Sequence, residues 1–352
     1  MNRVFPLPKL YRQSILRPLP RISLVTARRF ATKGSDHPTE DKPRSPTEGK
    51  AVAEHAKLDE GAKSGVSEEV LAPLQNIPTP ELFSLKNRTI IVTGAGRGLG
   101  LTLAHGFIES GAHVRAIDIL SKPTEPYWST ASSLATSKGL TLEYHNLDIT
   151  SETSTSKTFS KLFSSAPSNA PIRGLYISAG INHFLPAEEF SAEQFRRVID
   201  INLTGTFISA QAFAKEWFKK YGDKGEILKA GEGASVVFTG SMSGHIANAG
   251  LMCAPYGASK AGVNQLVRNL AMEWSKKGIR VNSLSPGYIQ TTLNNAVLAE
   301  HPEYTDLWVS QSLLGRLSTA DEFRGPATFL LSDASSFMTG ADIISDGGHT
   351  AT

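Results

Sequence analysis

Residues 89–100 decide the fold: Thr89-Ile90-Ile91-Val92-Thr93-Gly94-Ala95-Gly96-Arg97-Gly98-Leu99-Gly100. The β-branched run predicts a buried strand, and the glycines after it lead into an amphipathic helix near residues 99–110. Glycines at such a junction let backbone N–H groups and the helix N-terminus approach a pyrophosphate, because no Cβ atom is in the way. The segment therefore predicts a phosphate-binding turn, formed by Gly94, Arg97, Gly98, Leu99 and Gly100.

Strands and helices alternate from residue 83 to the C-terminus. Further strands are predicted at residues 113–117, 141–146, 174–178, 235–239, 280–285 and 342–345, and further helices at 151–164, 192–221, 255–277 and 319–331. This alternation is typical of a parallel sheet with crossover helices. The fold class is α/β, and we expect a single doubly wound Rossmann domain with a central parallel sheet over residues 83–352.

Asp118 follows the second predicted strand, about twenty residues beyond the glycines. A carboxylate in this place can accept hydrogen bonds from the ribose hydroxyls of NAD, and it repels the 2′-phosphate of NADP. Arg97, in the glycine turn, could pair with that phosphate instead. We expect NAD as the cofactor, and NADP stays possible.

The basic residues are concentrated at the N-terminus. Residues 1–33 contain eight Lys or Arg and no acid, which leaves 28 basic against 33 acidic residues in the rest of the chain. An Arg-rich, Ser-containing, acid-free leader is typical of a mitochondrial transit peptide, so we expect import into the matrix. The alternative is a disordered basic tail that carries no targeting signal. Residues 34–80 have no Phe, Trp or Tyr and are rich in Pro, Gly, Ser, Lys and Glu, which predicts a disordered linker.

Composition argues against several other classes of protein. With the leader set apart, no basic excess remains to neutralise nucleic-acid phosphates. No apolar run approaches the ~20 residues that span a bilayer, so no membrane association is expected. Cys253 is the single cysteine and cannot form an intramolecular disulfide, and we expect no metal site.

Tyr256 and Lys260 stand four residues apart at the start of a predicted helix, so both project from one face. A nearby ammonium favours the phenolate and lowers the tyrosine pKa, which makes the tyrosine a plausible acid and base for a carbonyl oxygen. A Tyr-x-x-x-Lys pair is common on helices as a surface contact, so the pair alone does not identify an active site.

Taken together, the motifs resemble the short-chain dehydrogenase/reductase family in identity and order. They are TGAGRGLG at 93–100, Asp118, Asp148, Ser178-Ala179-Gly180, Asn202, Ser241, Tyr256-x-x-x-Lys260 and Pro286-Gly287. The resemblance implies a catalytic tetrad of Asn202, Ser241, Tyr256 and Lys260. In it, Tyr256 exchanges the proton, Ser241 bonds the substrate oxygen, Lys260 holds the nicotinamide ribose, and Asn202 anchors a water relay.

The same resemblance implies further cofactor contacts. Asp148 and Ile149 would meet the adenine, and Ile289 and Thr291, after Pro286-Gly287, would hold the carboxamide. Ser178 and Gly180 stand where the family often has Asn-Ala-Gly, and the serine is expected to be tolerated. The family is usually dimeric or tetrameric through its long helices, so a homodimer or homotetramer is expected.

Two serines compete for the catalytic position. Ser241 precedes Tyr256 by fifteen residues and Ser243 precedes it by thirteen, the more usual family interval. Ser241 is preferred because it is the second residue past Thr239, at the strand end where the family places its hydroxyl. Ser243 remains the alternative.

The segment from Ser241 to Asn248 resembles the fungal sugar-alcohol branch of the family, which includes mannitol and D-arabinitol dehydrogenases and L-xylulose or sorbose reductases. A small polyol or ketose is therefore the expected substrate, with Asn182, His245 and Asn248 as candidates for its hydroxyl groups. A mitochondrial 3-oxoacyl thioester reductase that uses NADPH is an alternative, and a non-catalytic NAD sensor is a remote one.

Overall fold

The computed structural model describes residues 76–222, 232–291, 294–295, 298–299 and 301–351. The predicted transit peptide and nearly all of the predicted linker lie outside these residues. A short helix, α3 (Thr79–Leu82), begins within the last two residues of the predicted linker, so the linker prediction is wrong for these two residues.

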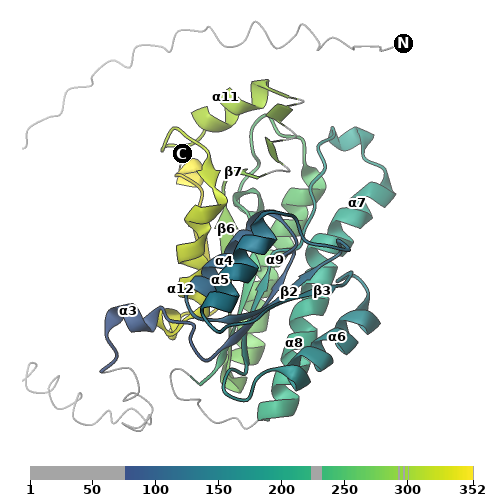
Figure 1. The fold of residues 1–352 in the computed structure, drawn as a ribbon. Coiled ribbons are helices and arrows are strands. Elements are labelled where there is room, and N and C mark those ends of the chain that lie inside the picture. The colour runs from purple at the N-terminus through teal and green to yellow at the C-terminus, as the bar shows by residue number, and fades with distance from the viewer. Residues whose placement is uncertain (1–75, 223–231, 292–293, 296–297, 300, 352) are drawn as a thin grey trace, which may run out of the picture. The chain divides into compact units, whose positions relative to one another are not determined.

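A seven-stranded parallel sheet forms the centre of the described region (Figure 1). Its order is β3-β2-β1-β4-β5-β6-β9. The strands are β1 (Thr89–Thr93), β2 (His113–Asp118), β3 (Leu142–Asn146), β4 (Ile172–Ile177), β5 (Ala234–Thr239), β6 (Ile279–Pro286) and β9 (Asp342–Ser345). The order reverses between β1 and β4, and doubly wound sheets bind ligands at the carboxyl ends of the strands beside such a reversal. The predicted Rossmann fold is confirmed.

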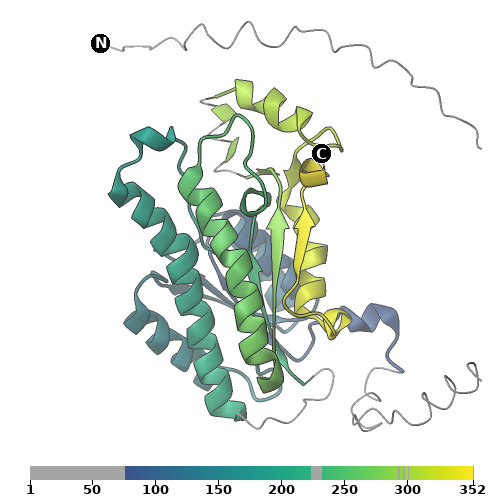
Figure 2. The same cartoon turned by 180° about the vertical axis from the view of Figure 1, so that it is seen from behind.

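Helices cover both faces of the sheet (Figures 1 and 2). One layer consists of α4 (Gly98–Glu109), α5 (Tyr127–Ser137) and α12 (Arg324–Leu331), and the other of α6 (Glu152–Ser165), α8 (Thr206–Tyr221) and α9 (Ala254–Trp274). Alternate β1 side chains pack into the cores on opposite faces of the sheet. Ile91 packs on the face that α6, α8 and α9 cover, and Ile90 and Val92 pack on the face that α4, α5 and α12 cover. This two-sided burial explains why β1 is apolar without polar alternation.

The predicted helix at residues 192–221 is divided in the structure. It consists of α7 (Ala192–Ile199), a π-helical turn (Asp200–Gly205) and α8. A π turn adds a residue to the helical repeat, and such turns occur frequently at functional sites. Here it carries Asn202, and sequence periodicity gave no sign of it.

Two helices and two short strands are among the elements that were not predicted. Helix α5 is rich in Ser and Thr, which are weak helix formers, and α11 (Glu303–Ser310) is a short helix after β7. The two-residue strands β7 (Ile289–Gln290) and β8 (Ser318–Thr319) pair with each other outside the main sheet. Within the described residues, no helix is both long enough and apolar enough to cross a membrane.

Candidate active site

A cavity of about 1390 Å³ opens along the carboxyl edge of the sheet. Residues that line it come from the carboxyl ends of β1 to β6, from the loops that follow them, and from helices that include α7 (Ala192–Ile199), α9 and α11. Every predicted cofactor residue except Asn202 is among them, as are Asn182 and Asn248. The sheet thus gathers residues that are nearly 200 positions apart in the sequence.

The glycine turn is shaped for a group that must approach the backbone. A Cβ at Gly100 would lie 2.1 Å from the Gly94 carbonyl oxygen, and one at Gly94 would lie 2.6 Å from the Ala179 backbone nitrogen. Gly98 has φ +53° and lines the cavity, and a Cβ there would meet no protein atom within 4 Å. Helix α4 begins at Gly98 without a side-chain cap, so its first N–H groups are available to a phosphate.

Asp118 is fixed at the end of β2. Its side chain is 8% exposed and lines the cavity. Oδ2 accepts the Gly96 N–H at 2.8 Å, and Oδ1 accepts the Leu120 N–H at 3.1 Å. A Cβ at Gly96 would stand 2.9 Å from the Asp118 carboxyl carbon, so the glycine also makes room for the carboxylate. Arg97 is exposed at the mouth of the same cavity.

The remaining predicted cofactor residues lie further along the cavity wall. Asp148 uses Oδ1 to accept the Thr150 N–H and hydroxyl, while the neighbouring Ile149 is buried. Beyond β6, Thr291 accepts the Asn294 N–H, and the Asn294 amide donates to the Ile289 carbonyl at 2.8 Å. These contacts hold the cavity walls without filling the cavity. The cavity, glycine turn and carboxylate together fit a nicotinamide dinucleotide.

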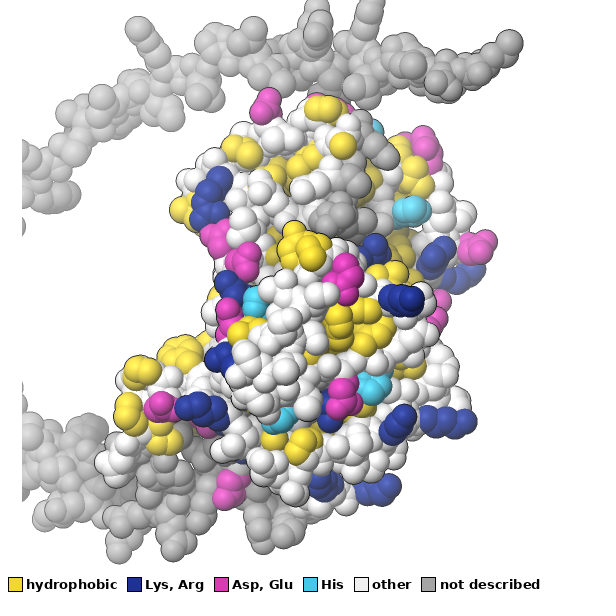
Figure 3. Space-filling view, viewed as in Figure 1, with side chains coloured by type: hydrophobic (Ala, Val, Ile, Leu, Met, Phe, Trp, Pro, Cys, Tyr) yellow, Lys and Arg dark blue, Asp and Glu magenta, His cyan; other side chains and the backbone are white. Residues whose placement is uncertain are grey.

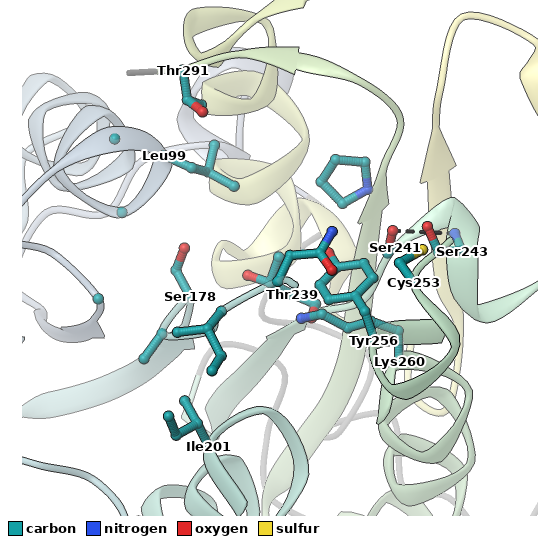
Figure 4. Close-up of a pocket in the computed structure, with 18 of the residues that line it drawn as sticks. Leu99, Ser178, Ile201, Thr239, Ser241, Ser243, Cys253, Tyr256, Lys260 and Thr291 are labelled. Carbon is teal, nitrogen blue, oxygen red and sulfur yellow. Dashed lines mark hydrogen bonds between the residues drawn. The ribbon is translucent and has the colours of Figure 1, made fainter. Parts of the chain in front are cut away.

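Tyr256, Ser241 and Lys260 come together on one wall of the cavity (Figure 4). The Ser241 hydroxyl lies beside the Tyr256 phenol, and it partly opposes the rise in the tyrosine pKa that burial causes. Lys260 is 5% exposed, and its Nζ donates to the Thr239 carbonyl at 2.7 Å and lies 5.7 Å from the Tyr256 ring centroid. Burial lowers the pKa of Lys260 to about 8.

The choice between the two serines follows from their contacts. The Ser241 hydroxyl meets Tyr256, and it also accepts the Ser243 N–H at 3.1 Å. The Ser243 hydroxyl instead accepts the Asn248 amide at 2.6 Å. The structure therefore places Ser241, not Ser243, in position to act with the tyrosine.

Asn202 lies behind the cavity wall and is fully buried. Its Oδ1 accepts the Ile181 N–H at 2.8 Å, and its Nδ2 donates to the Ile181 carbonyl at 2.9 Å and to the Ser259 hydroxyl at 3.1 Å. These contacts tie the π turn to the loop after β4 and to α9. The side chain of Asn202 thus orders the wall next to Lys260.

One predicted substrate residue is corrected by the structure. His245 does not line the cavity: its Nε2 lies 2.7 Å from Asp342 Oδ2 and 2.9 Å from the Asn264 amide. The ring is drawn to the carboxylate at the start of β9, a long-range contact that the sequence does not reveal. Asn182 and Asn248 do line the cavity, and Asn248 is buried.

Three aromatic residues of the cavity were missed, namely Phe184 and the stacked pair Tyr288 and Trp308. Tyr288 and Trp308 stack with ring centroids 4.4 Å apart and planes 2° apart, and Trp308 is 1% exposed. Trp308 belongs to α11, which was not predicted, so no sequence signal connected it with the site. The Gln311 amide holds this helix to the loop after Ser241 by donating to the Ala249 carbonyl at 3.0 Å.

The described residues contain no group of three or more His, Cys, Asp or Glu arranged to hold a metal ion. On the face shown in Figure 3, basic and acidic side chains are interspersed.

Comparison with known proteins gives consistent results. Residues 94–350 match the sequence family described as Enoyl-(Acyl carrier protein) reductase. The chain is 45% identical over 278 residues to "Short chain dehydrogenases/reductase notP'" of Aspergillus versicolor, covering 78% of this chain and 91% of the relative. It is 34% identical to an NADH-dependent L-xylulose reductase of Ambrosiozyma monospora and 35% identical to an NADP-dependent mannitol dehydrogenase of Hypocrea jecorina. In both cases 78% of this chain and 98% of the relative are covered.

Among solved structures, the crystal structure of gox2181 superposes with a TM-score of 0.68 at 33% identity. The match covers 78% of this chain and 99% of that one. The family match, over residues 94–350, includes the glycine turn and the Tyr256–Lys260 pair. On the evidence of the fold, the cavity and these relatives, the chain belongs to the short-chain dehydrogenase/reductase family and is an NAD(P)-dependent oxidoreductase.

Proposed function

We propose that this enzyme interconverts a secondary alcohol and a ketone, with a sugar alcohol and its ketose as substrates and NAD as the preferred cofactor. The observation that carries the proposal is the placement of Tyr256 beside Ser241 and Lys260 on one wall of a cavity that the glycine turn also lines. Relatives named for L-xylulose and mannitol support the substrate class.

Tyr256 supplies the proton when a ketone is reduced and takes it back when the alcohol is oxidised. Ser241 donates a hydrogen bond to the substrate oxygen, and so stabilises the charge that develops there. Lys260 binds the cofactor ribose, while Asn202 keeps the wall around Lys260 in place. When bound, the nicotinamide supplies or accepts the hydride.

The same geometry supports the following cofactor-binding roles. The N–H groups at the start of α4 hold the pyrophosphate, Asp118 accepts from the ribose hydroxyls, and Asp148 and Ile149 border the adenine. Ser178 and Gly180 line the middle of the cavity, and Pro286, Gly287, Ile289 and Thr291 border the nicotinamide.

The substrate class is tested by following nicotinamide absorbance with NAD and NADP against pentitols, hexitols, the matching ketoses and a 3-oxoacyl thioester. A sugar alcohol or ketose with the highest kcat/KM supports the proposal. Turnover of the thioester alone, with NADPH, contradicts it and establishes the alternative.

A second candidate is the reduction of a bulkier ketone with fewer hydroxyl groups. It is favoured by the apolar residues Phe184, Leu251 and Trp308, which line the cavity. It is also favoured because His245, predicted to bind substrate hydroxyl groups, contacts Asp342 instead and does not line the cavity. Adding cyclic and aryl ketones to the same panel distinguishes the two, because a polyol site leaves polar groups unpaired when such a ketone binds.

The preference for NAD follows from the placement of Asp118. Its Oδ2 accepts the Gly96 N–H of the glycine turn and its Oδ1 accepts the Leu120 N–H, which holds the carboxylate at the cavity, and a carboxylate in this place repels a 2′-phosphate. Asp118→Ser removes that charge while Arg97 stays available, so kcat/KM should shift toward NADP. A wild type that already prefers NADP contradicts this assignment.

Localisation and assembly are also part of the proposal. The acid-free basic leader supports import into the mitochondrial matrix, and family membership supports a homodimer or homotetramer through α8 and α9.

A further inference from the structure

The turn that carries Asp118, residues 118–120, is held from behind by two side chains of the neighbouring strand β3. Asn146 Nδ2 lies 2.8 Å from the Ile119 carbonyl oxygen and 2.9 Å from that of Leu120. The Tyr144 hydroxyl donates to the same Leu120 carbonyl at 2.6 Å. We call these two side chains the β3 latch.

The latch acts on the same turn that fixes the carboxylate. On the cavity side, the Leu120 N–H donates to Asp118 Oδ1, and on the far side the Leu120 carbonyl is held by Tyr144 and Asn146. The peptide units of the turn are thereby oriented with N–H groups toward Asp118 and carbonyls toward β3. Without the latch, these carbonyls would be free to rotate toward the carboxylate.

Tyr144 is suited to be a permanent donor. Burial, together with the nearby negative charge of Asp118, raises the pKa of Tyr144 to about 12, so the phenol keeps its proton at physiological pH. Its ring packs edge-on against Trp128, with centroids 5.5 Å apart. The hydroxyl is thus held in place by packing as well as by its hydrogen bond.

Neither latch residue lines the cavity, whereas Asp118 and Ile119 do. We infer that Tyr144 and Asn146 are positioning residues that set the preference between NAD and NADP by holding the Asp118 carboxylate where the ribose binds. The inference rests on the proposed role of Asp118. A displaced carboxylate loses its bonds to the ribose hydroxyls of NAD and no longer opposes the 2′-phosphate of NADP.

The test is the dissociation constant of NADH and of NADPH, measured by nicotinamide fluorescence on the full-length enzyme without substrate. Tyr144→Phe removes one donor and keeps the ring, and Asn146→Ala removes the other. In the double variant we expect Kd for NADH to rise about fivefold to tenfold, as expected when one or two hydrogen bonds are lost. Kd for NADPH should stay within about twofold, so that the preference changes.

Tyr127→Phe is the matched control, because Tyr127 is 69% exposed on nearby α5 and losing its hydroxyl should leave both constants unchanged. Equal weakening of NADH and NADPH in the latch variants would show that the latch only supports the fold, and no change would show that the turn needs no support. Either result overturns the inference.

A second comparison shows whether the effect passes through Asp118. In an Asp118→Ser background, the latch substitutions should leave the ratio of the two constants unaltered, because the carboxylate they position is gone. A ratio that still changes contradicts the inference. A wild type that prefers NADPH would contradict the proposed cofactor and leave this test intact, since the test concerns the change on substitution.

Discussion

Tyr256 is the residue whose removal separates chemistry from binding. Tyr256→Phe deletes one hydroxyl that lies beside Ser241 and leaves Lys260 bonded to the Thr239 carbonyl. We expect kcat to fall by about 10²-fold or more, because general acid–base groups contribute at least that much, while Kd for NADH stays nearly unchanged. Lys260→Ala should lower kcat and also weaken the binding of NADH.

Steady-state kinetics and fluorescence titration measure the two effects separately. If Tyr256→Phe keeps more than about a tenth of wild-type kcat, Tyr256 is not the acid and base.

Lys260 makes the stability of the cofactor-free protein depend on pH. Its folded pKa of about 8 is below the ordinary 10.5, so between these values the unfolded chain binds more protons and stability rises with pH. Below pH 8 the folded protein bears the cost of a buried ammonium, on the order of 3 kcal/mol. Lys260→Met should therefore be more stable than wild type at pH 7, and this advantage should shrink as pH rises toward 10.

Urea unfolding at several pH values measures the effect, with exposed Lys276→Met as the control. A stability difference between Lys260→Met and wild type that is the same at pH 7 and pH 10 contradicts the argument.

At the scale of elements, the junction of β1 with α4 tolerates different changes at different glycines. Gly100→Ala would place a methyl group 2.1 Å from the Gly94 carbonyl oxygen, which forces α4 away from the turn. Gly98→Ala meets no protein atom and carries only the strain of its positive φ, about 1–2 kcal/mol. We expect Gly100→Ala to be clearly the more destabilising of the two in thermal unfolding. If the two variants lose thermal stability equally, α4 can move away from the turn without destabilising the protein, and the argument is wrong.

At the scale of the whole molecule, we propose separate roles for the basic N-terminal segment and the enzyme domain. Eight basic residues and no acid in residues 1–33 predict import into mitochondria with removal of roughly the first thirty residues. N-terminal sequencing of protein purified from the organelle identifies the cleavage point. A chain that still begins at Met1, or a distribution that is unaffected when the leader is deleted, contradicts the prediction.

The sequence by itself determined the fold, because β-branched strands, a glycine turn and alternating helices are local patterns. The bounds of β1 and β9 were predicted to the residue, and the other sheet strands within about two residues. It also singled out Tyr256, Lys260 and Asp118, since a four-residue helical spacing and a strand-end carboxylate are visible in one dimension.

Only the tertiary structure decided contacts between distant segments. It turned His245 to Asp342, brought Trp308 into the cavity wall, set Ser241 rather than Ser243 against Tyr256, and placed β3 side chains behind Asp118. These outcomes depend on which strands become neighbours and on small shifts of loops between them. A local pattern carries no information about either, because the partner lies tens of residues away and is chosen by packing.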